Sequence, residues 1–360
     1  MDLKKLAIVN HNLGSGGAEK LIYDIALELK KRDVNFSVIL LTSHNCIYGK
    51  KLLEKGVDVI YLSHRWDIYS PKNIFRLIKV LKGYDVIHTH IYSAQLWTAF
   101  SSYFLPAKRY ITTEHNTNNN RRGKNIFRYL DRWMYSRYGE IVSITDKTES
   151  ALKEWIGEYK NRSIIQNGIN VRYYFGSSPL EREKLGYKKE DILLCQIARL
   201  NRVKKQETTL RALKELPDRY KVLFLGEGEE RENLEKLTKE LGLDTRVNFL
   251  GYRSDIANIL KMVDISLLTS EYEGLPISSL ESMLLTPFIG SDVPGISDLV
   301  KDSGLLFDFD NHIDLKNKVL ELGENKNFYE KIKDSCHEKA KLFSIENTVD
   351  RYMKVYEGIE

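Results

Sequence analysis

The segment EYEGLPISSLE, residues 271–281, places two carboxylates beside the expected start of a helix. Pro276 suits the first turn of that helix, which would run through Leu284 and turn its apolar side chains toward the core. Glu281 would then be a partly buried carboxylate, and such a group needs polar partners. Together with Glu273 in the preceding loop and the loop N–H groups between them, it suits a ligand rich in hydroxyl and phosphate groups. The alternative is a structural ion pair at Glu281 and a solvated Glu273.

Two basic residues follow the apolar run ILLCQIA: Arg199 and, five residues later, Lys204. A guanidinium can bind a diphosphate through a bidentate fork, and an ammonium can bind it as a point charge. Basic residues are common after strands, so this pair alone does not separate a phosphate site from a charged surface.

The segment GSGGAE near the N-terminus joins flexible glycines to the start of a helix. Free N–H groups and the helix dipole at such a start favour an anion, which places Gly16 and Gly17 among the candidate phosphate contacts. The glycines do not have the spacing of the dinucleotide-binding fingerprint, so a simple tight turn is the alternative.

Three histidines, His88, His90 and His115, lie at or near the ends of two expected strands in the first half. Two imidazoles at i and i+2 share a strand face, but no carboxylate or cysteine completes a zinc set. A polar contact or a proton acceptor is the favoured role, with His88 as a hydrogen-bonded core residue. The run NTNNNRRGK after His115 is typical of a polar loop that could bind phosphate.

Short apolar runs alternate with helical patterns along the whole chain, from KLAIVN to PFIGSD. Several runs are apolar at successive positions, as in strands that are buried on both faces of a parallel sheet. The pattern predicts an α/β protein with two doubly wound parallel sheets and a boundary near residues 170–180, where Gly176 to Pro179 have a hinge composition. Because ligands bind at the carboxyl ends of such strands, nearly every candidate residue above would lie at one edge of a sheet.

Composition narrows the class of protein. Of the 360 residues 42% are hydrophobic and 29% charged, which excludes collagen-like and disordered classes. We expect no membrane span and no signal peptide, and the three scattered cysteines predict neither a disulfide framework nor a metal site. These features favour a cytoplasmic protein.

The net charge of +5 is unevenly placed, because residues 71–137 carry twelve Lys or Arg and three Asp or Glu. This excess suggests a phosphate-bearing substrate, a membrane surface or nucleic acid, or simply a solvated charged face. Within KNIFRYLDRWMYSR, Arg128, Arg132 and Trp133 could lie against anionic headgroups. The alternative is an ordinary surface helix that packs its apolar residues, Phe127, Leu130 and Met134, inward. No base-reading motif is present, so we expect no nucleic-acid partner.

Taken together, these motifs resemble those of the family 4 glycosyltransferases, retaining enzymes of the GT-B fold with two Rossmann-like domains that face each other across a cleft. The resemblance covers nearly the whole chain: GSGGAE, TTEHN, IIQNGIN, RLNRVKK, LGEGEE, VNFLGY and EGLPISSLE stand in the family's order. It implies catalytic roles for His115, Glu273, Arg199 and Lys204. It also implies donor contacts from Gly16, Gly17, Arg199, Lys204, Gly226, Tyr252, Glu273, Gly274, Leu275, Pro276 and Glu281, with Glu273 on the sugar and Glu281 on the ribose.

The chain departs from the family pattern at Leu285, where glycine is usual, and at Asp298, where glutamate is common. Neither is an expected phosphate or sugar contact. The resemblance implies no metal, and no cofactor, because the nucleotide-sugar is a substrate. His115 would act either as a base or in positioning the donor sugar.

The resemblance therefore implies a retaining transfer of a hexose-type sugar from a UDP-sugar to a lipid-linked or glycan acceptor in surface-polysaccharide or glycolipid assembly. The alternatives are a sugar-nucleotide epimerase, a nucleotide-binding module without transferase activity, and an oxidoreductase, which the missing fingerprint disfavours. We expect an acceptor-side domain at residues 1–170, a nucleotide-sugar domain at 171–344 and a helix at 345–360 that packs back onto the first domain. The basic first half would allow peripheral contact with the inner face of a membrane.

Overall fold

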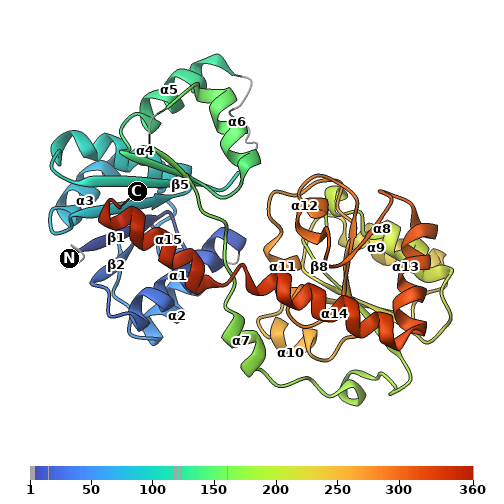
Figure 1. Ribbon diagram of the computed structural model, residues 1–360. Coiled ribbons are helices and arrows are strands. Elements are labelled where there is room, and N and C mark those ends of the chain that lie inside the picture. Colours follow the sequence, from blue (N-terminus) through green and yellow to red (C-terminus); the bar gives the residue numbers. More distant parts are fainter. Residues whose placement is uncertain (1–4, 15, 117–120, 122–123, 160, 360) are drawn as a thin grey trace. The chain divides into compact units, whose positions relative to one another are not determined.

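The computed structural model describes residues 5–14, 16–116, 121, 124–159 and 161–359 (Figure 1). Two compact units divide the chain. The first contains the described residues up to Gly168 together with those from Ile345 onward, and the second runs from Ile169 to Ser344. The hinge-like segment that begins at Gly176 lies inside the second unit. Most of the polar run after His115 falls outside the described residues.

The first unit is built on a seven-stranded parallel sheet with the order β3-β2-β1-β4-β5-β6-β7. Its strands are β1 (Leu6–Asn10), β2 (Phe36–Leu40), β3 (Val59–Tyr61), β4 (Val86–His90), β5 (Arg109–Glu114), β6 (Glu140–Ser143) and β7 (Arg162–Ile164). The order reverses at β1, so the chain crosses both faces of the sheet, and the doubly wound topology predicted from the apolar runs is confirmed.

Helices cover both faces of this sheet: α1 (Gly17–Lys31), α2 (Ile47–Glu54), α3 (Lys72–Leu81), α4 (Tyr92–Ser101), α5 (Asn125–Tyr135), α6 (Asp146–Ile156) and α15 (Ile345–Glu357). Successive side chains of β1 enter two separate cores, Leu6 on one face and Ala7 on the other, because strand side chains alternate. The C-terminal helix α15 packs beside α1 and places Val349 and Tyr352 in the first of these cores (Figure 1).

The second unit repeats this plan with six parallel strands in the order β10-β9-β8-β11-β12-β13. They are β8 (Ile192–Ile197), β9 (Tyr220–Leu225), β10 (Val247–Gly251), β11 (Ile265–Leu268), β12 (Phe288–Ser291) and β13 (Leu305–Phe307). Strand β13 lies beyond PFIGSD, the last of the predicted strands, and was not predicted. The order reverses at β8, which lies between β9 and β11.

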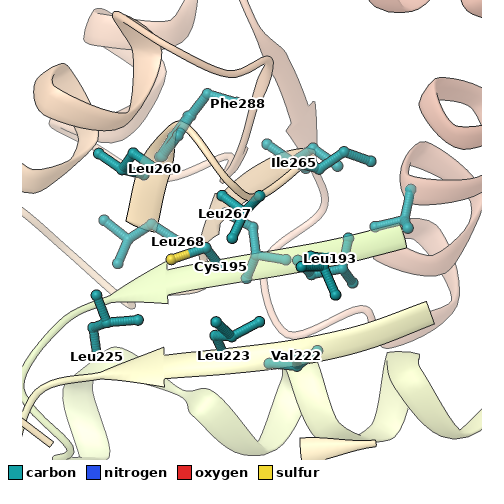
Figure 2. Packing of buried hydrophobic residues seen from close by; sticks show 14 of the residues in the cluster. Leu193, Cys195, Val222, Leu223, Leu225, Leu260, Ile265, Leu267, Leu268 and Phe288 are labelled. Atoms are coloured by element: carbon teal, nitrogen blue, oxygen red, sulfur yellow. The ribbon is translucent and has the colours of Figure 1, made fainter. Parts of the chain in front are cut away.

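The helices of the second unit are α7 (Val171–Gly176), α8 (Gln206–Lys214), α9 (Arg231–Glu240), α10 (Ile256–Leu260), α11 (Ile277–Met283), α12 (Ile296–Val300), α13 (His312–Glu324) and α14 (Lys326–Lys341). The core is a single cluster, and Figure 2 shows Cys195 of β8, Leu223 of β9 and Leu267 of β11 within it. Burial raises the pKa of the Cys195 thiol to about 12, so this cysteine is a packing residue. Among the described residues, no helix has the length and hydrophobicity needed to span a bilayer.

Candidate functional site

Two loops meet at the carboxyl edge of the second sheet, one after β8 and one after β11. The Lys204 ammonium, from the first loop, forms an ion pair with the Glu273 carboxylate, from the second. Ser270 Oγ donates a hydrogen bond of 2.7 Å to the same Glu273 oxygen. Since β8 and β11 are the neighbours at which the strand order reverses, this pair lies where doubly wound sheets bind ligands.

The loop that carries Lys204 is held by buried polar side chains. Thr269 Oγ1 donates to the Lys204 carbonyl at 2.8 Å, and the Gln196 amide donates to the same carbonyl at 3.2 Å. Gln196 in turn accepts from Thr209 Oγ1 at 2.7 Å. These three side chains are each 1% exposed. Their buried hydrogen bonds therefore hold the loop backbone that carries the Lys204 side chain.

Glu273 is positioned by a close approach of Gly295. A Cβ at position 295 would lie 2.2 Å from the Glu273 carbonyl oxygen, and Gly295 has a φ of +92° that other residues rarely adopt. The Asp298 carboxylate accepts a hydrogen bond of 3.3 Å from the Gly295 N–H, so the departure noted at this position caps the turn. Gly274 differs: a Cβ there would meet no atom within 4 Å, which leaves space beside the ion pair.

Helix α11 begins at Ile277, one residue later than expected, and ends at Met283. Pro276 precedes the helix as its N-cap residue, with extended backbone, and Leu275 is half-buried beside it. The predicted inward face is confirmed, since Leu280 is 0% exposed. Glu281 is more deeply buried than expected, at 6% exposure.

Arg199 and Tyr252 are predicted donor contacts whose side chains are exposed to solvent. The Arg199 guanidinium is largely exposed and lies 3.1 Å from a Glu229 oxygen. Tyr252 is 48% exposed just after β10. Gly226 has a packing reason to be glycine, because a Cβ there would lie 2.1 Å from the Ala198 carbonyl oxygen. Gly226 therefore lets the loops after β8 and β9 pack together and so helps to place Arg199.

In the first unit, the predicted histidines form a cluster. His90 Nδ1 and His115 Nε2 share a hydrogen bond of 3.0 Å, and the rings of His88 and His90 are 4.1 Å apart. His88 is fully satisfied, with Tyr356 and Thr113 hydroxyls both at 2.8 Å, as predicted for a core histidine. Burial lowers the pKa of His115 to about 4, so the imidazole is neutral near pH 7.

The predicted glycine loop does open a helix, since Gly16 is the N-cap residue of α1 and Gly17 its first residue. Sequence reasoning missed Glu19 here. A Cβ on Gly16 would lie 2.3 Å from Glu19 Oε2, so this carboxylate folds back over the start of the helix. Burial raises the pKa of Glu19. The signal was present in the sequence, because Glu at the third helical position is typical of a side chain that turns back to the N-cap.

The basic aromatic segment forms helix α5, and its packing is that of the second alternative, an ordinary surface helix. Met134 is buried and Leu130 half-buried, as in an ordinary surface helix. Arg128 donates through Nε to the Trp155 carbonyl at 2.7 Å, so this arginine has a structural partner. Ile126 and Tyr129 are 76% and 74% exposed, and these two residues, rather than Trp133, form the open apolar surface of the helix.

Comparison with known proteins matches both halves of the chain. Residues 15–173 match the family described as Glycosyltransferase Family 4, and residues 177–340 match the family described as Glycosyl transferases group 1. The crystal structure of Anabaena Alr3699/HepE in complex with UDP-glucose superposes with a TM-score of 0.85 at 20% identity, covering 99% of this chain and 100% of that one. At this identity the likeness shows a shared fold.

Two curated relatives bear names that specify their substrates. The GalNAc-alpha-(1->4)-GalNAc-alpha-(1->3)-diNAcBac-PP-undecaprenol alpha-1,4-N-acetyl-D-galactosaminyltransferase of Campylobacter jejuni is 26% identical over 370 residues, 98% of each chain. The UDP-Gal:alpha-D-GlcNAc-diphosphoundecaprenol alpha-1,3-galactosyltransferase of Escherichia coli is 24% identical over 309 residues, 80% of each chain.

Proposed function

This chain belongs to the group 1 glycosyl transferases, and from that premise we propose that it moves a hexose-type sugar from a UDP-sugar to a lipid-linked or glycan acceptor, with retention of configuration. The observation that carries the proposal is the ion pair of Lys204 with Glu273 at the switch point of the second sheet. It supplies a cation for phosphate and an acceptor for hydroxyl groups within one small region.

The chemical problem is charge on the leaving group. When the bond between the sugar and phosphate breaks, the bond electrons stay on the phosphate oxygen of the departing UDP. Lys204 and the open Arg199 would stabilise that charge. Glu273 would accept hydrogen bonds from sugar hydroxyls, and buried Glu281 would hold the ribose. We propose that these side chains supply the positive charge and the hydrogen bonds without a metal ion.

The acceptor hydroxyl would attack on the face from which UDP leaves, and its proton would pass to the leaving phosphate oxygen. His115 then positions the donor sugar. Its lowered pKa supports this role, because an imidazole with a pKa of about 4 is a poor proton acceptor near pH 7. The proposed reaction yields the glycosylated acceptor and UDP.

The relatives from C. jejuni and E. coli support a lipid-linked acceptor, since both names specify a diphosphate lipid. We propose a role in the assembly of a surface polysaccharide or glycolipid, with the protein held peripherally at the cytoplasmic face of a membrane. The excess of basic residues in the first unit supports such a contact.

The first test is a thermal-shift panel with UDP, GDP, ADP and NAD. A ligand at a hundredfold excess over its dissociation constant stabilises the folded state by about 2.7 kcal/mol. We expect a shift with UDP that is lost in Glu281→Ala and weakened in Glu281→Gln, which keeps the shape of the side chain. A thermal shift with NAD alone would contradict the proposal, and so would the absence of a shift with any of the four nucleotides. Transfer from UDP-sugars to a diphosphate lipid acceptor would then identify the sugar.

A further inference from the structure

A basic pocket lies in the first unit, in the loop that joins β3 to α3. It has a volume of about 540 Å³, and its lining includes Ser63, Arg65, Asp67, Ser70, Lys72 and Arg76. The loop follows the carboxyl end of β3, so the pocket lies at the same edge of the sheet as His115 and the Gly16 loop. No residue of this pocket belongs to the predicted donor site.

The charges of this pocket are unbalanced. Arg76 donates to Asp67 at 2.7 Å and to Asn73 at 2.9 Å, so the one acidic side chain of the lining is already neutralised. Within the described chain, no hydrogen bond or ion pair engages the side chains of Arg65 or Lys72. Two free cations therefore face one pocket, an arrangement that fits a doubly charged anion.

Hydroxyl groups add hydrogen-bonding capacity beside these cations. Ser70 Oγ accepts from the Lys72 backbone N–H at 3.4 Å, and Ser63 Oγ accepts from the Arg65 backbone N–H at 3.1 Å. These bonds use oxygen lone pairs, and the Ser70 hydroxyl hydrogen remains able to donate to a phosphate oxygen.

Exposed aromatic side chains stand next to the lining residues in the sequence. Trp66, Tyr69 and Phe75 are 54%, 63% and 73% exposed. The Trp66 ring lies edge-on to the rings of His11 and His44, with centroids 6.1 and 5.5 Å away. His11 follows β1 and His44 follows β2, so Trp66 connects the basic pocket to the loops after these two strands. Aromatic faces at this position suit a sugar ring or an apolar chain.

We propose that this pocket binds the phosphate or diphosphate group of the acceptor. Arg65 and Lys72 bind that group, and the aromatic side chains contact the part of the acceptor that is attached to the phosphate. The identity of the anion as part of the acceptor rests on the proposed function. The anion site itself rests on the pocket and its two free cations.

The test uses inorganic pyrophosphate as the probe, titrated calorimetrically into protein saturated with UDP, so that the donor site is already filled. We expect the double variant Arg65→Ala/Lys72→Ala to weaken pyrophosphate binding about tenfold or more. The matched control is Lys79→Ala/Lys82→Ala, which removes the same charge from exposed positions outside the pocket. In transfer assays, the KM for a diphosphate-linked acceptor should rise in the double variant, while the KM for the UDP-sugar stays unchanged.

Equal pyrophosphate affinity in the double variant and its control would overturn the proposal. A binding assay with vesicles of phosphatidylglycerol and phosphatidylcholine distinguishes two occupants of the pocket, the phosphate of the acceptor and a membrane headgroup. Loss of phosphatidylglycerol binding in the double variant, with pyrophosphate affinity kept, would also overturn it. Pyrophosphate binding that depends on Arg65 and Lys72, in a protein that transfers no sugar, would support the anion site and reject the proposed function.

Discussion

The Lys204 ammonium and the Glu273 carboxylate, 69 residues apart in the sequence, bind each other directly. They meet because β8 and β11 are neighbours in the sheet, and the loops that follow them leave the same edge. The side chains are only 20% and 12% exposed, so solvent screens the pair weakly. In the proposed reaction each has another partner, the donor phosphate for Lys204 and the sugar for Glu273. Donor binding would therefore exchange this ion pair for two new contacts.

We expect Lys204→Ala to lower kcat/KM about a hundredfold or more, because it removes a cation from the developing phosphate charge. It should also reduce the free energy of unfolding by about 1–3 kcal/mol, since Glu273 loses a charged partner. Steady-state kinetics and urea unfolding measure the two effects. Lys205→Ala is the control, because Lys205 lies next in the chain but pairs with Glu207 and Asp310. Unchanged UDP affinity in Lys204→Ala would remove Lys204 from the donor site.

Gly295→Ala should damage the site without touching a proposed ligand contact. The new Cβ would meet the Glu273 carbonyl oxygen, and a left-handed backbone costs a non-glycine residue about 1–2 kcal/mol. We expect a lower melting temperature and a smaller thermal shift with UDP, as the Glu273 loop moves. Gly176→Ala is the control, since a Cβ there would meet no atom within 4 Å. A full UDP shift in Gly295→Ala would show that the position of this loop does not matter for the nucleotide.

Acidification should destabilise the first unit through its histidine cluster. Burial lowers the pKa of His88 to about 3 and that of His115 to about 4, whereas both are near 6.5 in the unfolded chain. Between these values the unfolded state binds more protons than the folded state. The free energy of unfolding should therefore fall with pH below 6.5, by up to about 1.4 kcal/mol per pH unit for each group.

Urea unfolding at pH 7, 6 and 5 would measure this slope. His88→Gln removes one titrating group, so its stability should depend less steeply on pH than that of the unaltered protein. The same slope in both proteins would indicate that His88 is protonated equally in the folded and unfolded states.

Tyr356→Phe should loosen the C-terminal helix. The phenol hydroxyl lies 2.8 Å from His88 Nδ1, and its loss leaves that buried nitrogen without a partner. We expect a loss of about 1–3 kcal/mol in the free energy of unfolding. Tyr129→Phe makes the same chemical change at a position that is 74% exposed and should have almost no effect. Similar losses in both variants would show that the bond to His88 adds nothing.

The fold class and most of the strands were predictable because they depend on local patterns. Runs such as KLAIVN are apolar at successive positions, and only a strand covered on both faces buries all of them. The apolar face of α11 could be identified from its helical spacing, and His88 as a core residue from its position within an apolar strand. Strand β13 was not predicted, although it is no shorter than β3 and β7, because the last apolar run that was interpreted as a strand is PFIGSD.

The sequence by itself determined which residue types stand after which strands, since periodicity and punctuation are local properties of the chain. Only the tertiary structure decided which of these residues meet. The ion pair of Lys204 with Glu273, the contact of Gly295 with the Glu273 carbonyl and the bond between His90 and His115 all depend on strand order and loop path. That the basic pocket holds two free cations likewise depends on the tertiary structure, in which Asp67 pairs with Arg76. Such pairings arise from long-range packing, which leaves no periodic signal in the sequence.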